Sequence, residues 1–582
     1  MDAPDRVPGD RLAGDSRLFL AVAAVTALAL LARFVLLGDR VAHWDEARVG
    51  YWILDFARTG TYYYRPIVHG PFFQQVNRLV FGLIGASDFS MRVAAALVGG
   101  LLPLSALLFR ARLRDSEVVA LSLFLAANPI LLYFSRFMRG DVVVGGFMFV
   151  GFALLVRGID TRRPWYLLPS FVAIALAFTA KENAFAYLAA WVGASVLLLD
   201  HRLIRARDQE GTSWGDVATG EIRRVGRAVR SALPQLLVSL VAFVLVIVVF
   251  YAPRGDVPSN GTFYRFCSST PRVVDMGNVV GFGQLLAHPG AIPDVVIVST
   301  AGSFEVFACQ WIGGSGNPYL PFLGDLALTV GYGAGALALL GIIGFVADRY
   351  GDAAPRDLVM FAFYWGVASL FGYPIITDIK APWAAVHVVL PLAIPAAVGA
   401  ALIYRWGTEA LAEDDRVSVA LAFGLLLLVA GQVAGAAVYT SYVAPQSRSN
   451  ELVQYAQPEG RLHPTLDRMA DLAAKNDQGP DVLLYGDYFV DGDTEATRAP
   501  ACAKWFNSLP LPWYWQKGKI DVACATSGDD LNQRLAANPP PVVIVPTTNR
   551  SEVARRLGDD YEAHEYLLRS FDTNTVFFLR KG

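Results

Sequence analysis

The sequence predicts a mainly helical membrane protein that crosses the bilayer many times and ends in a small α/β domain. Of its 582 residues, 54% are hydrophobic and only 17% are charged, whereas a soluble domain carries about 25% charged residues. The mean hydropathy is +0.41. Aromatic residues make up 12% of the chain, which excludes a disordered protein. The 49 basic and 51 acidic residues nearly cancel, so no global basic field favours nucleic acid as a partner.

Eleven apolar segments approach the length of about 20 residues that a helix needs to cross a bilayer. They are 18–37, 91–109, 117–134, 142–157, 165–180, 184–199, 233–252, 323–346, 357–373, 384–404 and 417–441. No small-residue cleavage site follows the first of them, so we interpret it as an anchor rather than a removable signal peptide.

The arginines predict how the chain is oriented, because short cytoplasmic loops collect Lys and Arg. Alternate loops carry Arg110, Arg112, Arg114, Arg157, Arg162, Arg163, the arginines of 200–232, Arg349, Arg356, Arg405 and Arg416. We therefore expect residues 1–17 to be cytoplasmic and 18–441 to form the transmembrane domain, with large external loops at 38–90 and 253–322. Residues 442–582 are expected outside the cell membrane.

The C-terminal stretch 442–582 has the pattern of a small α/β domain. Short apolar runs at 481–485, 541–545 and 575–579 predict strands, and helical patterns lie near 462–475, 528–537 and 550–557. Strands that alternate with helices are typical of an α/β domain.

The four cysteines fall into two separate external segments. Cys267 and Cys309 lie in the large external loop, and Cys502 and Cys524 lie in the external domain. Two pairings within these segments suit an oxidising compartment. The alternative is four buried free thiols, because sequence does not supply the geometry that a disulfide requires.

The first candidate site is the run 43–48, directly after the first span. Asp45 and Glu46 stand side by side next to His43, and one of these carboxylates could take a proton from an acceptor hydroxyl while the other orients a group or a cation. The alternative is a solvated turn that ends a hydrophobic helix.

The same loop then carries three consecutive tyrosines at 62–64, followed by Arg65 and His69. This aromatic and basic cluster could bind a sugar ring. An aromatic belt at headgroup depth is the alternative interpretation.

Three short turns on the Arg-poor side carry isolated charges. Arg136, Arg139 and Asp141 lie in the first, and Lys181 and Glu182 lie in the second. A charged side chain near the bilayer core costs free energy, so its presence indicates a function. The planar guanidinium of Arg is shaped to bind phosphate oxygens. Interfacial salt bridges, with Lys181 and Glu182 neutralising each other, are the alternative.

The third turn contains Lys380 beside Trp383, and His387 follows in the next span, where a lone His is more often a packing residue. No GxxxxGKS loop, HExxH or CxxC motif occurs, which disfavours ATP hydrolysis and a dedicated zinc site. The charges and aromatics together suit a phosphate-bearing polar head attached to a membrane lipid.

These motifs resemble the GT-C superfamily of membrane glycosyltransferases, of the protein mannosyltransferase and aminoarabinose transferase type. Within this superfamily the motifs look most similar to an archaeal subgroup described as flippase-activity-associated in N-glycosylation. The residues that carry this similarity are 43–47, 69–71, 135–141, 179–183 and 380–383. Weaker similarities to the same subgroup lie at 451–455 and 511–515.

The resemblance implies an extracytoplasmic inverting transfer in which Asp45 is the catalytic base and Glu46 its neighbour. Arg136, Arg139, Lys181 and Lys380 become the residues expected to hold a lipid phosphate. Some members use a divalent cation near the acidic loop and others do not, so the resemblance leaves the metal open.

Two functions follow as expectations. The first is a glycosyltransferase that moves a sugar from a polyprenyl-phosphate donor, such as a dolichol phosphate, to a glycan, lipid or protein acceptor. The second is a non-catalytic protein that binds lipid-linked sugars or helps them cross the membrane. The retained acidic motif favours the enzyme.

Overall fold

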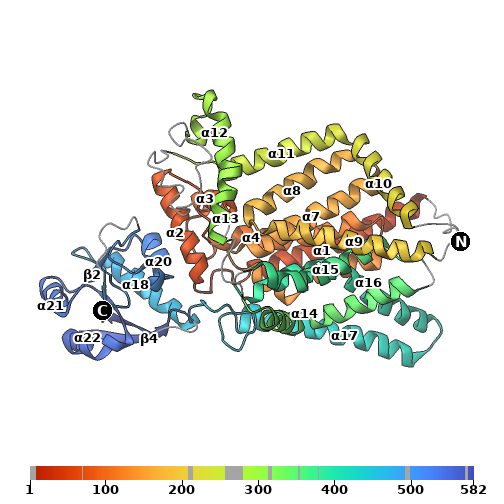
Figure 1. The fold of residues 1–582 in the computed structure, drawn as a ribbon. Helices are drawn as coiled ribbons and strands as arrows, with labels where there is room; N and C mark the ends of the chain where they lie inside the picture. The colour runs from red at the N-terminus through yellow and green to blue at the C-terminus, as the bar shows by residue number, and fades with distance from the viewer. Residues whose placement is uncertain are drawn as a thin grey trace. The chain divides into compact units, whose positions relative to one another are not determined.

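The computed structural model describes residues 8–67, 70–207, 214–255, 279–311, 317–351, 354–377, 379–491, 498–569 and 574–581. The chain divides into two compact units (Figure 1). The first unit comprises Met1–Val35, Tyr62–Phe72 and Ala94–Val443. The second comprises Leu36–Thr61, Phe73–Val93 and Ala444–Gly582.

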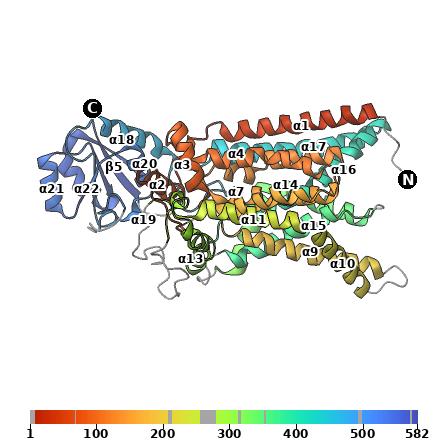
Figure 2. The same ribbon diagram turned by 90° about the horizontal axis from the view of Figure 1, so that it is seen from above.

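The first unit is a bundle of helices, and most of its long helices run along one direction in both views (Figures 1 and 2). Its helices are α1 (Pro8–Phe34), α4 (Val93–Leu101), α5 (Asp115–Ala127), α6 (Pro129–Phe134), α7 (Gly140–Thr161), α8 (Leu167–Ala180), α9 (Ala184–Arg207), α10 (Trp214–Ser231), α11 (Leu233–Tyr251), α12 (Ile292–Ile297), α13 (Ser303–Trp311), α14 (Tyr319–Tyr350), α15 (Asp357–Ile376), α16 (Ala385–Ala412) and α17 (Arg416–Val438).

Within the described residues, nine helices are long and apolar enough to cross a membrane, and two shorter apolar helices accompany them. The nine are Ser16–Phe34, Ser90–Phe109, Gly140–Thr161, Leu233–Tyr251, Pro289–Cys309, Tyr319–Tyr350, Asp357–Ile376, Pro382–Ala412 and Arg416–Val443. The shorter ones are Pro164–Ala180 and Ala184–Leu199. The predicted helical membrane architecture is therefore confirmed.

The segment expected as one span at 117–134 is instead two helices, α5 and α6, which meet at Asn128. Pro129 has no backbone N–H to continue the first helix. The Asn128 side chain accepts hydrogen bonds from the backbone N–H groups of Ile130 and Leu131, at 3.0 and 3.2 Å, and so begins α6.

The stretch 253–322, expected as an external loop, contains an apolar helical segment at Pro289–Cys309. Its helices α12 and α13 are joined by a π-helical turn at Val298–Gly302. Figure 1 shows that they run across α8 and α11 rather than along them. Their length and composition suit a membrane span, but their direction differs from that of the bundle.

Helices α14 and α16 approach each other closely through small residues. A Cβ on Gly344 would collide with the carbonyl oxygen of Pro395, and a Cβ on Gly399 would collide with that of Leu340. Small residues allow membrane helices to pack backbone against backbone. Most of α16 is consequently buried, which makes it the central helix of the bundle.

The second unit contains a five-stranded sheet with strand order β2-β1-β3-β5-β4. The strands are β1 (Val482–Tyr485), β2 (Val522–Ala525), β3 (Val542–Pro546), β4 (Tyr561–Leu567) and β5 (Asn574–Arg580). Strand β1 is parallel to β2 and β3, whereas β5 is antiparallel to β3 and β4. The helices of this part are α18 (His463–Lys475), α19 (Trp505–Ser508), α20 (Leu511–Gly518), α21 (Gly528–Ala537) and α22 (Arg550–Leu557).

Helices cover both faces of this sheet. Leu531 of α21 and Val553 of α22 join one buried cluster with alternate strand residues such as Val543. On the opposite face, Thr465 of α18 is hydrogen-bonded to Tyr566, at 2.8 Å. The small C-terminal sheet domain expected from the sequence is present.

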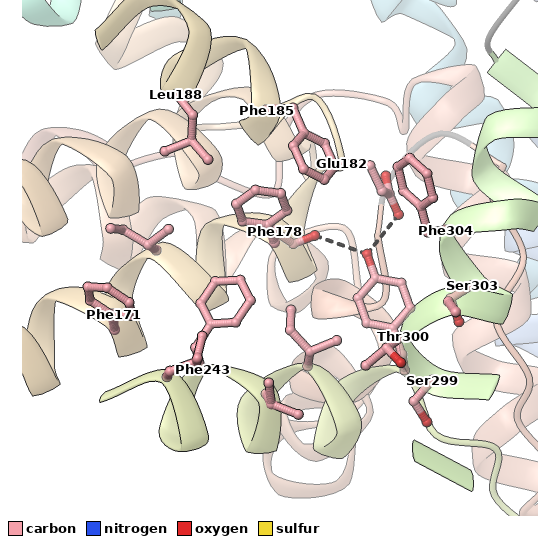
Figure 3. A pocket seen from close by; sticks show the side chains of 16 residues that line it. Phe171, Phe178, Glu182, Phe185, Leu188, Phe243, Ser299, Thr300, Ser303 and Phe304 are labelled. Carbon is pink, nitrogen blue, oxygen red and sulfur yellow. Dashed lines mark hydrogen bonds between the residues drawn. The ribbon is translucent and has the colours of Figure 1, made fainter. Parts of the chain in front are cut away.

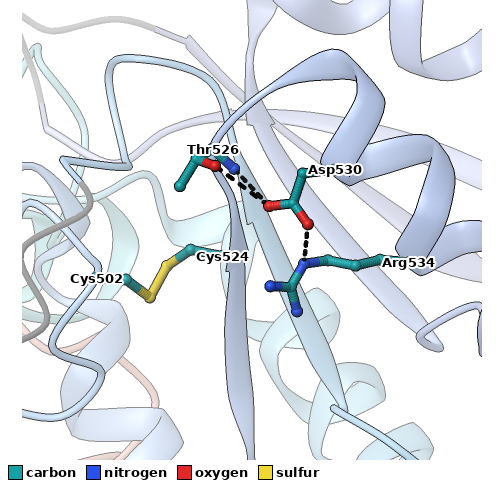
Figure 4. Close-up of a disulfide and its surroundings, with 5 residues drawn as sticks. All are labelled: Cys502, Cys524, Thr526, Asp530 and Arg534. Carbon is teal, nitrogen blue, oxygen red and sulfur yellow. Dashed lines mark hydrogen bonds and ion pairs between the residues drawn. A yellow bond between two sulfur atoms is a disulfide. The ribbon is translucent and has the colours of Figure 1, made fainter.

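A disulfide between Cys502 and Cys524 ties a loop to β2 (Figure 4). It is one of the two pairings expected from the sequence. Cys309 is also disulfide-bonded, and Cys267, its expected partner, lies outside the described residues.

Two helices from the first half of the chain belong to the second unit. Helix α2 (Trp44–Thr59) packs against α20, and α3 (Phe72–Ile84) follows it in the chain. Trp513 and Tyr514 of α20 both donate hydrogen bonds to Asp88, at 2.7 Å. A Cβ on Gly50 would lie 2.7 Å from the Trp513 ring, so this glycine permits the close packing. The aromatic motif at 511–515 thus supports helix α2, whose first turn carries Asp45.

Candidate functional site

The two neighbouring carboxylates of the acidic loop have different surroundings in the second unit. Glu46 is fully buried and accepts two hydrogen bonds from the Arg92 guanidinium, at 2.9 and 2.8 Å. It also accepts one from the backbone N–H of His43, at 2.9 Å, which completes a capping box at the start of α2. Glu46 is therefore a structural residue that anchors the first turn of α2.

Burial alone would raise the pKa of Glu46. The Arg92 guanidinium, assisted by Arg40 and the backbone N–H of His43, overcomes this and holds the pKa well below its ordinary value of 4.5. Because both carboxylate oxygens bind Arg92, Glu46 does not combine with Asp45 into a two-carboxylate cation site.

Asp45 lies in the first turn of α2, where the helix dipole favours a negative charge. Its backbone N–H donates to Nδ1 of His43, at 3.1 Å, and one carboxylate oxygen lies 3.8 Å from the same nitrogen. His43 therefore serves as the N-cap that orients Asp45. Arg92 and Arg40 act on the carboxylate of Glu46, whereas the charge of Asp45 interacts with Arg48, three residues further along α2.

A second group of candidate residues lies in the first unit and surrounds the Asp141 carboxylate. We call this group the Asp141 cluster, and its members are Arg139, Asp141, Lys181, Trp383 and His387. The Asp141 carboxylate lies 2.7 Å from Nζ of Lys181, 3.4 Å from Nε of Arg139 and 3.4 Å from Nε2 of His387. The guanidinium of Arg139 lies 3.9 Å from the centre of the Trp383 ring. The structure thus gathers three sequence-predicted charges from two turns.

His387 is held from two further sides. Its Nδ1 is hydrogen-bonded to the hydroxyl of Tyr187, and the Tyr373 ring stacks on it at 4.3 Å between centres. We expected His387 to be a packing residue, and its contact with Asp141 has no local sequence signal because 246 residues separate the two.

Glu182, next to Lys181, faces away from that ion pair. Its carboxylate accepts hydrogen bonds from the hydroxyls of Tyr64 and Tyr251, at 2.6 and 2.9 Å. Burial raises the pKa of Glu182 above its ordinary value of 4.5, against the lowering effect of these hydrogen bonds and of Lys181. The expected neutralisation of Lys181 therefore comes from Asp141, because Glu182 is bound by tyrosines.

An apolar cavity of about 590 Å³ begins at this carboxylate (Figure 3). Its walls come from α8, α9 and α11 and from the segment 299–304, and phenylalanines such as Phe178, Phe243 and Phe304 contribute much of them. Glu182 and Tyr251 form a polar end, where the Tyr251 hydroxyl donates to the Glu182 carboxylate, at 2.9 Å. The cavity suits a long apolar chain with a polar group at one end.

The other predicted residues lie apart from these contacts. Arg136 donates to the carbonyl oxygens of Ala32, Arg33 and Val35, at 2.7 to 3.1 Å, and so caps the end of α1. Lys380 pairs with Asp325 of α14.

Arg65 stacks on the Tyr63 ring, at 3.8 Å. His69 lies outside the described residues, but its neighbour Gly70 is held by a hydrogen bond from its N–H to the carbonyl oxygen of Ala180, at 3.1 Å. Among the described residues, no group of three or more His, Cys, Asp or Glu side chains is placed to hold a metal ion.

Two family models match the sequence. Residues 68–209 match the model of dolichyl-phosphate-mannose-protein mannosyltransferases, a segment that contains Arg139, Asp141 and Lys181. Residues 462–580 match the Agl23 flippase-associated protein C-terminal domain. A search of curated proteins gives no match.

Two solved structures of ArnT from Cupriavidus metallidurans share the fold. The apo structure is 17% identical, covers 97% of this chain and 98% of its own, and has a TM-score of 0.53. The structure bound to undecaprenyl phosphate is 16% identical, covers 96% of this chain and 97% of its own, and has a TM-score of 0.51.

The helical bundle and its sheet domain therefore have the ArnT-like GT-C fold. The chain thus combines a segment similar to the dolichyl-phosphate-mannose-protein mannosyltransferase model with a C-terminal segment similar to the Agl23 flippase-associated model. The resemblance predicted from the sequence motifs is confirmed.

Proposed function

We propose that the protein transfers a sugar from a polyprenyl-phosphate-linked donor to an acceptor on the extracytoplasmic face. The observation that carries the proposal is that Lys181 of the Asp141 cluster directly precedes Glu182, which lines the polar end of the apolar cavity and interacts electrostatically with Lys181. A basic group near a long apolar space suits a phosphate on an isoprenoid chain. The mannosyltransferase model covers this segment, and ArnT was solved with undecaprenyl phosphate, which supports the same donor class.

The phosphate is assigned to Lys181 and Arg139. Lys181 supplies a compact ammonium, and Arg139 supplies a planar guanidinium that the Trp383 ring orients from one side. Asp141 and His387 fix these cations when the donor is absent. The isoprenoid chain is assigned to the cavity that ends at Glu182.

Asp45 is assigned the role of catalytic base. It accepts the proton of the acceptor hydroxyl while that oxygen bonds to the anomeric carbon and the bond between this carbon and the phosphate oxygen breaks. The lipid phosphate leaves with the electron pair of the broken bond, as an anion whose charge a nearby cation stabilises. Asp45 is suited to this role because it stands in the first turn of α2, where the N-cap His43 accepts a hydrogen bond from its backbone N–H and so fixes its position.

The test is a transfer assay in membranes supplied with a labelled dolichyl-phosphate sugar. Asp45→Asn keeps the shape of the side chain and removes the base, so we expect transfer to fall about 10²- to 10⁴-fold. The matched control is Asp55→Asn, which removes a carboxylate that pairs with the exposed Arg58 on the same helix. Transfer at the control rate by Asp45→Asn, at equal protein level, would falsify the assignment.

The second candidate function is translocation of lipid-linked sugar without chemistry, which the Agl23 flippase-associated match favours. It predicts that vesicles containing the protein move a labelled lipid-linked sugar between leaflets and leave its attachment unchanged. Lys181→Met is expected to weaken binding of the lipid phosphate in both functions, whereas Lys380→Met is the control. An unchanged sugar-lipid bond with full translocation in Asp45→Asn would select this second function.

A further inference from the structure

The C-terminal part of the second unit contains a polar cavity of about 510 Å³. It lies where β1, β2 and β3 end, and it is lined by residues that directly follow each of these strands. The three strands are parallel, so their carboxyl ends meet at one edge of the sheet. Open sheets commonly bind ligands at such an edge, where neighbouring connections diverge to helices on opposite faces.

Gly486 makes this edge possible. Its φ is +99°, a conformation that favours glycine, and a Cβ there would lie 2.7 Å from Oδ1 of Asn549 and 2.9 Å from Cδ of Pro546. The chain leaving β1 therefore passes close to the chain leaving β3. The disulfide at Cys524 ties the carboxyl end of strand β2 to the same region, near Thr526 (Figure 4).

The chemistry of the lining is that of hydroxyl, amide and carboxylate groups. Tyr485, Tyr488, Thr548 and Asn549 provide aromatic, hydroxyl and amide groups, and Asp487 and Asp491 provide carboxylates. The described lining contains no Lys, Arg or His side chain. The lining of this cavity is therefore mainly polar, whereas the cavity between the helices has a mainly apolar lining.

Several of these groups are held in place by their neighbours. Glu552 accepts hydrogen bonds from the Tyr485 hydroxyl, at 3.0 Å, and from the Asn549 amide, at 3.2 Å. The Tyr488 hydroxyl accepts one from Arg569, at 2.9 Å. The side chain of Asp487 is exposed, and within the described residues its carboxylate has no hydrogen-bond or ion-pair partner.

We propose that this edge binds an uncharged saccharide, with sugar hydroxyls donating to Asp487 and exchanging hydrogen bonds with Thr548 and Asn549. A neutral polyhydroxylated ligand satisfies carboxylate, hydroxyl and amide groups together, and tyrosines add apolar faces for the C–H side of a sugar ring. This binding site goes beyond the proposed transfer reaction, and it does not require Asp45 or the Asp141 cluster.

The experiment measures binding of methyl glycosides of glucose, mannose and galactose to the full-length protein in nanodiscs, by saturation-transfer NMR titration. At least one glycoside is expected to bind saturably. A hydrogen bond to a charged group is worth about 1.5–3 kcal/mol, so Asp487→Asn should weaken this binding about tenfold or more. Thr548→Val should weaken it less. The control, Asp477→Asn, changes an exposed carboxylate elsewhere in the unit and should bind normally.

A second arm distinguishes a free glycan from the lipid-linked donor, with dolichyl-phosphate-mannose as the probe. Asp487→Asn should leave its binding unchanged, and Asp45→Asn should leave glycoside binding unchanged even if transfer is lost. The proposal is overturned if none of the glycosides binds, or if Asp487→Asn and Thr548→Val both bind like the control. It is equally overturned if the edge instead takes Ca²⁺ or inorganic phosphate in place of the sugars.

Discussion

Glu46 and Asp45 are adjacent in the chain, yet their carboxylates have different neighbours. Both carboxylate oxygens of Glu46 accept hydrogen bonds from Arg92, and this ion pair fixes the first turn of α2, which carries Asp45. A buried ion pair of this kind is sensitive to loss of one partner, because the remaining charge stays buried without compensation. Glu46 therefore controls stability, and we expect its substitution to act on folding before it acts on activity.

We predict that Glu46→Gln destabilises the protein by about 3–5 kcal/mol at neutral pH, since Arg92 remains buried. Asp55→Asn, which breaks an exposed pair with Arg58, should cost less than about 1 kcal/mol. Thermal unfolding of the purified proteins in detergent gives the order of their Tm values. A Glu46→Gln variant with the Tm of the parent would contradict a structural role.

The lowered pKa of Glu46 also predicts a pH dependence. A carboxyl whose pKa is lower in the folded state than its ordinary value of 4.5 contributes stability above pH 4.5, and this contribution is lost as the pH falls. The Tm of the parent should therefore drop on acidification below pH 4.5 by more than that of Glu46→Gln. Equal drops in the two proteins would indicate that other carboxylates dominate.

At the scale of elements, the close approach of α14 and α16 depends on glycines at the crossing. We predict that Gly344→Ala destabilises the bundle by about 1–3 kcal/mol, because the new Cβ would collide with the backbone of α16 at Pro395. Gly324→Ala in the same helix is the control, since nothing lies within 4 Å of its added Cβ.

Thermal unfolding of both variants in the same detergent tests this prediction. A lower Tm for Gly344→Ala, with Gly324→Ala unchanged or slightly stabilised, is the expected result. Similar Tm values for the two variants would mean that the helices separate without cost.

The sheet shows why some elements are predictable and others are not. The three strands expected from apolar runs are β1, β3 and β5, whose residues are largely buried. The two that were missed, β2 and β4, are the edges of the sheet. Strand β4 carries Glu562, His564 and Glu565 and is only partly buried, so it lacks the continuous apolar pattern of a central strand.

At the scale of the whole molecule, the membrane spans were largely predictable because length and hydrophobicity decide them. The helix break at Pro129 required knowledge of how Asn128 caps the next helix. The site could be predicted only in pieces: Asp141 and Lys181 stood out as charges between apolar segments, whereas His387 joins them through tertiary packing alone. Arg136 carries the same sequence signal as Arg139, but it caps α1.

The orientation in the membrane is a prediction for the entire chain, and introduced cysteines can test it. We expect Asp477→Cys to react with a membrane-impermeant maleimide in intact cells and Glu413→Cys to react only after permeabilisation. Both positions are exposed, and no free cysteine occurs among the described residues to compete. The Cys502–Cys524 disulfide suits the oxidising side. Labelling in the reverse pattern would invert the topology.

The short helices on either side of Lys181 have a consequence for the bilayer itself. Pro164–Ala180 has 17 residues, and at about 1.5 Å per residue it is about 25 Å long, against a hydrocarbon thickness of about 30 Å. Such hydrophobic mismatch is relieved when the bilayer thins locally or when the polar turn sits below the surrounding surface. In the first case the membrane beside Lys181 is thinner than it is beside α14, whose helix has 32 residues, and in the second case the turn lies below the membrane surface. Lipid thickness is therefore a variable to which this turn responds, and bilayers made from shorter acyl chains should accommodate it with less distortion.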